Sequence, residues 1–135
     1  MKSLSEIETV SKRSSRAAGY SWGIAEEVGK NTRMLEMLGM PGIKNLNHYY
    51  KTNNKKNFEK INLISRKNKK TQLEYCPITA GVNFLDQVKS LEGLNEIKFQ
   101  NIAFPILFLP FVSRASEVVG KKILLKIDNS NFLLN

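Results

Sequence analysis

The sequence predicts a single-domain α+β protein in which N-terminal helices pack on a small mixed or antiparallel sheet. The first forty residues repeat apolar side chains at helical spacing, whereas the last third contains segments with strand-like patterning. The length of 135 residues is that of one domain. An apolar fraction of 41% with 24% charged residues is ordinary for a globular chain, which argues against disorder of the whole chain.

Capping residues define the two N-terminal helices. Ser3 or Ser5 can cap the first helix, and Gly19 follows its last turn as a left-handed residue would. Ser21 can cap a second helix, which a Gly-Met-Pro-Gly stretch ends after Leu38. A glycine inside this second helix predicts a tight helix crossing, because glycine is otherwise unfavourable there.

The middle of the chain combines a third helix with a Lys/Asn-rich region over about residues 51–72. A short helix is predicted from Ile43 to Tyr50. Residues 51–60 have the composition of a solvated loop. Two short strands, Lys60–Ser65 and Thr71–Tyr75, predict a charged hairpin around the intervening turn.

The last third predicts two helices and a β-hairpin. Apolar spacing favours a helix over Val82–Leu91, and Pro110 fits the first turn of a helix that runs to Val119. Strands are predicted over Glu96–Ile102, Ile123–Ile127 and Phe132–Leu134, the last two joined by an Asp-Asn-Ser turn. Because the sequence stops inside this hairpin, we expect a C-terminal part to be missing.

The net charge of +9 comes from one segment of the chain. Residues 41–72 carry nine basic residues and one glutamate, whereas the rest is close to neutral. Lysines interleaved with aromatic residues can bind nucleic-acid phosphates, and the anion-binding candidates are Lys51, Lys55, Lys56, Lys67, Lys69 and Lys70. Only one of the nine basic residues is an arginine, which disfavours bidentate recognition. A solvated loop is therefore the preferred interpretation, and nucleic acid is a disfavoured partner.

A second set of candidates lies on the predicted helices. Arg114 and Glu117 stand one helical turn apart, where a surface salt bridge is the preferred interpretation. Alternatively, they line a ligand pocket together with Arg16, Trp22 and Glu26, between the second helix and the Pro110 helix.

Sequence motifs of catalysis and metal binding are absent. The chain has no P-loop, GxGxxG, HExxH or GxSxG motif, and only two aspartates. Its single histidine, His48, and single cysteine, Cys76, form no metal-ligand pattern, and a lone cysteine cannot form an internal disulfide. We expect no cofactor and no metal, and enzymatic activity stays an open question.

The sequence shows no membrane or export signal. The N-terminus has no apolar core of a signal peptide, and the longest apolar run, residues 103–112, is too short to span a bilayer. We therefore expect a cytoplasmic protein that does not associate with membranes.

Five stretches of the chain resemble one bacterial family. They are SLSEIE at residues 3–8, RAAG at 16–19, SWGIAEEVGK at 21–30, CPITAG at 76–81 and LPFVSRASEVVG at 109–120. The family is catalogued as a domain of unknown function, numbered three-seven-two-six. The resemblance implies no activity and no catalytic residues, and it is weakest in the Lys/Asn-rich middle and at the C-terminal end.

The sequence predicts a non-catalytic binding or self-associating module, with a homo-oligomer as the expected assembly. Helix faces of small residues, three methionines near the end of the second helix and an apolar C-terminal third all favour packing against a partner. Two alternatives stay open. One is an enzyme or metabolite binder with the pocket described above, and the other is an anionic-polymer binder that uses residues 44–70.

Overall fold

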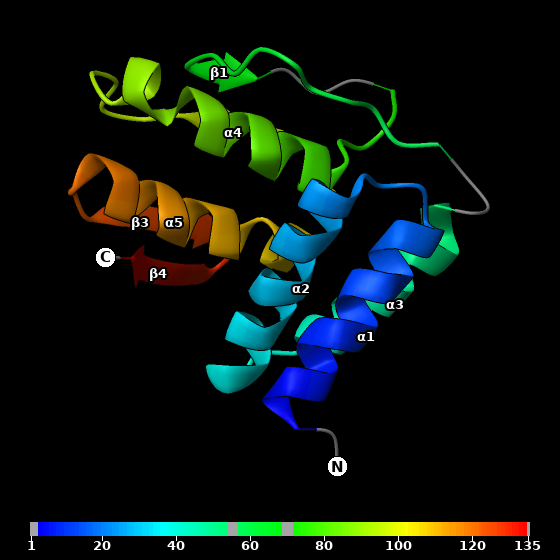
Figure 1. Cartoon of the computed structure of the whole chain (residues 1–135). Helices are drawn as coiled ribbons and strands as arrows, with labels where there is room; N and C mark the ends of the chain where they lie inside the picture. The colour runs from blue at the N-terminus through cyan, green and yellow to red at the C-terminus, as the bar shows by residue number, and fades with distance from the viewer. Residues whose placement is uncertain (1–2, 54–56, 69–71, 135) are drawn as a thin grey trace. The chain divides into compact units, whose positions relative to one another are not determined.

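The computed structural model describes residues 3–53, 57–68 and 72–134 (Figure 1). These residues contain five α-helices, one short 3-10 helix and two two-stranded sheets, which confirms the predicted α+β class. The chain divides into two compact units, Met1–Lys56 and Asn57–Asn135. The single-domain organisation therefore stays a prediction. Among the described residues, no helix combines the length and the apolar character that a bilayer crossing requires.

The first unit consists of three helices, α1 (Leu4–Ala17), α2 (Trp22–Met37) and α3 (Gly42–Asn53). Two serines cap α1 and α2 as predicted. Ser3 Oγ accepts a hydrogen bond from the Glu6 N–H, and Ser21 Oγ accepts one from the Ile24 N–H. Gly19 has φ 104° in the connection between them, as its predicted left-handed role requires. The third helix is longer than predicted, since it continues to Asn53.

Close packing at Gly29 joins α1 and α2. A Cβ atom on Gly29 would lie 2.8 Å from the backbone oxygen of Glu8, so the two helices approach closely there. This confirms the predicted tight crossing. Tyr50 on α3 donates a hydrogen bond to Ser15 Oγ on α1, which ties the third helix to the first. The buried apolar side chains of this unit are Ile7, Ala25, Val28, Leu35, Leu46 and Tyr49.

The second unit contains the remaining elements. In chain order they are β1 (Lys67–Asn68), α4 (Pro77–Leu91), β2 (Lys98–Phe99), the 3-10 helix η1 (Pro105–Leu107), α5 (Leu109–Val119), β3 (Ile123–Ile127) and β4 (Ser130–Leu134). Helices α4 and α5 pack together at Gly81, where a Cβ atom would lie 2.1 Å from Phe111 Cδ2. As predicted, β3 pairs antiparallel with β4, with Leu125 opposite Phe132. This hairpin lies against α5 (Figure 1).

Helix α4 begins five residues earlier than the predicted Val82. Cys76 is its N-cap, and the thiol Sγ accepts a hydrogen bond from the Thr79 N–H at 3.4 Å. Pro77 occupies the first turn, where its missing N–H leaves no hydrogen bond unmade. The predicted strand Glu96–Ile102 is shorter than expected, since only the two residues of β2 form a strand.

The predicted hairpin in the Lys/Asn-rich region is wrong. Residues 60–65 form no strand, and β1 instead pairs parallel with β2, with Lys67 opposite Lys98 and Asn68 opposite Phe99. Part of the predicted turn and the start of its second strand, residues 69–71, lie outside the described residues.

Side-chain amides of α4 take the place of a sheet partner for this segment. Asn83 Nδ2 donates to the carbonyl of Ile61 at 2.7 Å. The Gln87 side chain accepts from the N–H of Ile64 at 2.9 Å and donates to the carbonyl of Asn62 at 2.6 Å. Some backbone N–H and C=O groups of the segment are therefore hydrogen-bonded without β-structure. It also contributes Ile61 and Ile64 to the buried core of the second unit.

Candidate functional site

The predicted ligand-binding residues fall into two groups. Arg16, Trp22 and Glu26 belong to the first unit, whereas Arg114 and Glu117 lie on α5 in the second unit. Arg114 is half-buried and Glu117 is exposed. The pocket predicted between α2 and α5 stays a prediction.

The first group gathers around an exposed tryptophan. Trp22 is 56% exposed although it has the largest apolar ring among the side chains. The Lys12 ammonium lies 5.5 Å from the centre of the ring, and Arg16 Cζ lies 5.0 Å from it. Both distances are in the range of cation–π attraction. We call Lys12, Arg16, Trp22 and Glu26 the Trp22 cluster.

Local structure fixes the geometry of the Trp22 cluster. Lys12 and Arg16 are four residues apart on α1, so they share one helical face. The cap at Ser21 makes Trp22 the first residue of α2. Lys12 Nζ pairs with Glu26 Oε1 at 3.3 Å, and an N–H of the Arg16 guanidinium donates to the carbonyl of Tyr20 at 2.9 Å. Both cations therefore have a second contact besides the ring.

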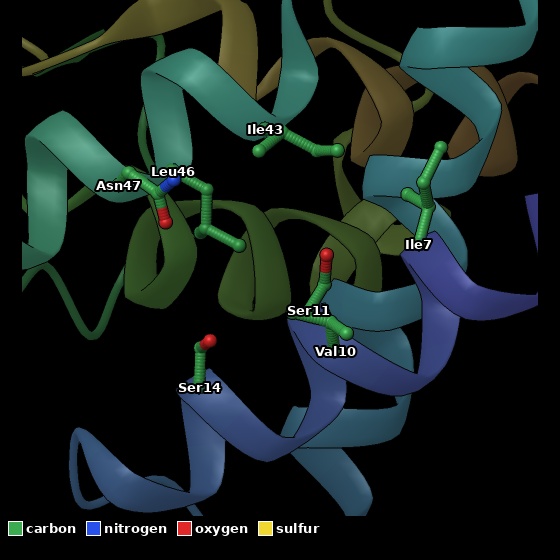
Figure 2. Close-up of a pocket in the computed structure, with 7 residues that line it drawn as sticks. All are labelled: Ile7, Val10, Ser11, Ser14, Ile43, Leu46 and Asn47. Atoms are coloured by element: carbon green, nitrogen blue, oxygen red, sulfur yellow. The ribbon is translucent and has the colours of Figure 1, made fainter. Parts of the chain in front are cut away.

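A groove separates α1 from α3 in the same unit (Figure 2). Its lining residues are Ile7, Val10, Ser11, Ser14, Ile43, Leu46 and Asn47. The hydroxyl groups of Ser11 and Ser14 point toward α3 (Figure 2). The groove encloses about 350 Å³, part of which is open solvent. The lining provides two serine hydroxyls but no acid, histidine, lysine or thiol beside them.

The β3–β4 hairpin presents a second apolar surface. Leu124 and Leu133 lie opposite each other in the two strands, and they are 53% and 63% exposed. The other face of the hairpin, which includes Ile123, Leu125 and Leu134, packs against the core of the second unit. In the described part of the chain, neither strand of the hairpin pairs with a third strand.

The structure describes two of the six anion-binding candidates, one in each unit. Lys51 lies in the last turn of α3, and Lys67 lies in β1 of the other unit; both side chains are exposed. Lys55, Lys56, Lys69 and Lys70 lie outside the described residues. These lysines stay a prediction as an anion-binding site.

The histidine and the cysteine occupy different environments. His48 is exposed on α3, and Cys76 is buried at the start of α4. No three side chains of His, Cys, Asp or Glu cluster as a metal site within the ranges 3–53, 57–68 and 72–134.

One family model matches the chain over residues 2–75, and the family is described as "Protein of unknown function (DUF3726)". The match contains the SLSEIE and SWGIAEEVGK stretches and the whole Trp22 cluster, and it ends before CPITAG. No curated protein and no solved structure matches the chain.

Proposed function

This chain belongs to that family of unknown function, and we propose that it is a non-catalytic module that binds another protein through the Trp22 cluster. The observation that supports the proposal is the exposed Trp22 ring, with two cations of α1 within cation–π distance of it. An isolated leucine on a surface is ordinary, but a tryptophan with this exposure leaves a large apolar ring in water.

Tryptophan and arginine are the residues that most often dominate the binding energy of protein interfaces. Such interfaces combine an apolar centre with a polar rim. In the Trp22 cluster the indole ring supplies the centre, and Lys12, Arg16 and Glu26 supply the rim.

Preorganisation also favours binding at this place. The Lys12–Glu26 ion pair and the hydrogen bond from Arg16 to Tyr20 restrict two flexible side chains before a partner arrives. Binding therefore costs less side-chain conformational entropy, which favours a higher affinity. Two cations and one carboxylate leave the cluster with a net positive charge, so the proposed partner offers a carboxylate beside an apolar pocket.

A nucleic acid is the competing ligand, because bases stack on tryptophan and phosphates attract lysine and arginine. Nucleic acids are bound by several cations along the phosphate backbone, whereas Glu26, 3.3 Å from Lys12 Nζ, leaves the cluster a net charge of only one cation; we therefore favour a protein. The metabolite-binding and enzymatic alternatives depend on the ligand pocket predicted from the sequence, which stays a prediction.

Affinity capture from cells that produce the protein tests the proposal. Immobilised wild-type chain is compared with Trp22→Ala and with Met37→Ala, which removes a 62% exposed apolar side chain from the same helix. We expect Trp22→Ala to weaken capture of a specific protein by about thirtyfold, as for a residue worth about 2 kcal/mol at an interface. Met37→Ala is expected to bind as the wild type does, and circular dichroism checks the fold of both variants.

Equal capture by the wild type and Trp22→Ala would contradict the proposal. Trp22 is the only tryptophan of the chain, so its fluorescence reports directly on this place. A titration with single-stranded DNA at low salt tests the competing ligand. Quenching that disappears with added salt would favour nucleic acid over protein.

A further inference from the structure

We infer that the chain forms a two-fold symmetric dimer in which β4 pairs antiparallel with β4 of a second copy. The two hairpins would then form one four-stranded sheet in the order β3–β4–β4–β3. This interaction uses the second unit, so it is independent of the Trp22 cluster and goes beyond the proposed function.

The outer edge of β4 is a regular hydrogen-bonding edge. A two-residue turn at Asp128 and Asn129 joins the strands, with Ile127 opposite Ser130. In an antiparallel pair, hydrogen-bonded residues alternate with residues whose N–H and C=O groups point outward. The pair that flanks a two-residue turn is hydrogen-bonded, so Asn131 and Leu133 direct their backbone groups away from β3. The described residues provide no strand to receive them.

This edge is complementary to itself. Asn131 and Leu133 stand on either side of Phe132, at the centre of the five-residue strand. When a second copy runs antiparallel with Phe132 on the two-fold axis, Asn131 faces Leu133 of the second copy, and Leu133 faces Asn131 of the second copy. One symmetric interface thereby satisfies all the outward groups of both residues.

The charge distribution favours β4 over β3 as the pairing edge. Exposed edges are commonly protected from pairing by charged residues, especially lysine. Strand β4 contains none, whereas Lys126 lies in β3 at one of its outward positions.

The exposed leucines support the same arrangement. A two-stranded sheet is marginal by itself, and a larger sheet with an apolar face is more stable. Pairing of β4 with β4 brings two Leu124–Leu133 pairs onto one face, where each is now more than half exposed. The dimer would therefore partly cover apolar surface that the single chain leaves in water.

A matched pair of proline variants tests the inference by light scattering after size exclusion. Asn131→Pro removes an outward N–H of β4, while the hydrogen bonds to β3 remain, because edge strands tolerate proline at such positions. Lys126→Pro makes the same change at the opposite residue in β3. We expect wild type and Lys126→Pro to be dimers, and the dimer dissociation constant of Asn131→Pro to rise at least tenfold.

Disulfide trapping tests the register. Residues that face each other across a non-hydrogen-bonded pair are about 4.5 Å apart between Cα atoms, within the range of a disulfide. Phe132→Cys is therefore expected to cross-link two chains under mild oxidation, whereas Asn131→Cys, displaced from the axis, is not. The native Cys76 is buried. A wild-type monomer at high concentration, or equal dissociation of both proline variants, would overturn the dimer. Cross-linking at position 131 instead of 132 would overturn this register.

Discussion

The two units differ in where their backbone N–H and C=O groups find hydrogen-bond partners. In Met1–Lys56, three helices make most of these bonds within a few residues, and serines cap two of the helices. In Asn57–Asn135, an irregular segment depends on side chains more than twenty residues away, such as Asn83 and Gln87. Local interactions therefore build the first unit, whereas the second needs long-range partners before its chain path is defined.

In each unit a glycine allows two helices to approach closely, but the two sites differ in how much an added Cβ would overlap its neighbours. At Gly29 an added Cβ would lie 2.8 Å from the backbone oxygen of Glu8, which is a small overlap. At Gly81 it would overlap the ring of Phe111, which is only 1% exposed. We therefore expect the second unit to be the more sensitive to an added methyl group.

The largest expected effect is that of Gly81→Ala. A Cβ atom 2.1 Å from Phe111 Cδ2 forces the ring or the helix to move. Overpacking of this kind outweighs the gain in helix propensity, and we expect a loss of about 2–3 kcal/mol in the free energy of unfolding. Urea denaturation followed by circular dichroism measures it. Gly93→Ala is the control, since an added Cβ there meets nothing within 4 Å; an equal loss in both variants would refute the packing argument.

An intermediate effect is expected for Asn68→Ala, which tests the dependence on long-range amide contacts. The Asn68 side chain is 5% exposed, donates to the carbonyls of Ser65 and Lys98, and accepts from the N–H of Ser65. Its loss leaves part-buried backbone groups of Ser65 and Lys98 without these hydrogen bonds, at a cost of about 2 kcal/mol.

Hydrogen exchange locates this effect. We expect faster exchange at Ser65 and Lys98 in Asn68→Ala, and unchanged exchange in α1. Asn62→Ala, whose side chain is exposed, serves as the control. If exchange at Ser65 stays as slow as in the wild type, the side chain of Asn68 does not hold this segment.

The smallest effect is expected for Gly29→Ala in the helical unit. The contact with Glu8 is unfavourable, but alanine gains up to about 1 kcal/mol of helix propensity over glycine. We expect a net loss of about 1 kcal/mol, read from the fluorescence of Trp22 during denaturation. Gly23→Ala, in open space on the same helix, is expected to be neutral or stabilising. A stabilised Gly29→Ala would show that α1 and α2 separate at little cost.

The fold was predictable where its signals are local. The capping serines, Gly19 and the apolar spacing predict α1 and α2, and the turn after Ile127 predicts the hairpin. The parallel pairing of β1 with β2 was not predictable, because it joins residues about thirty positions apart and involves only two residues in each strand. Asn68 fell in the turn of the predicted hairpin, and composition does not distinguish an exposed asparagine from a buried one.

The candidate site was predictable in part. The sequence suggested Arg16, Trp22 and Glu26 as neighbours, and the structure brings these three together. The sequence analysis did not include Lys12 among the candidates, although its spacing of four residues from Arg16 on one helix was a usable signal. The role of Cys76 as a helix cap was also missed, because cysteine is not among the preferred capping residues.

Because Cys76 is buried at this cap, the alkylation of its thiol can report on local opening of the second unit. Its thiol is 4% exposed and is hydrogen-bonded to the first turn of α4, so an alkylating reagent reaches it only when that turn opens. The labelling rate of the unmodified protein therefore measures how often the start of α4 opens. Because the chain has one cysteine, this rate reports on a single position without any substitution.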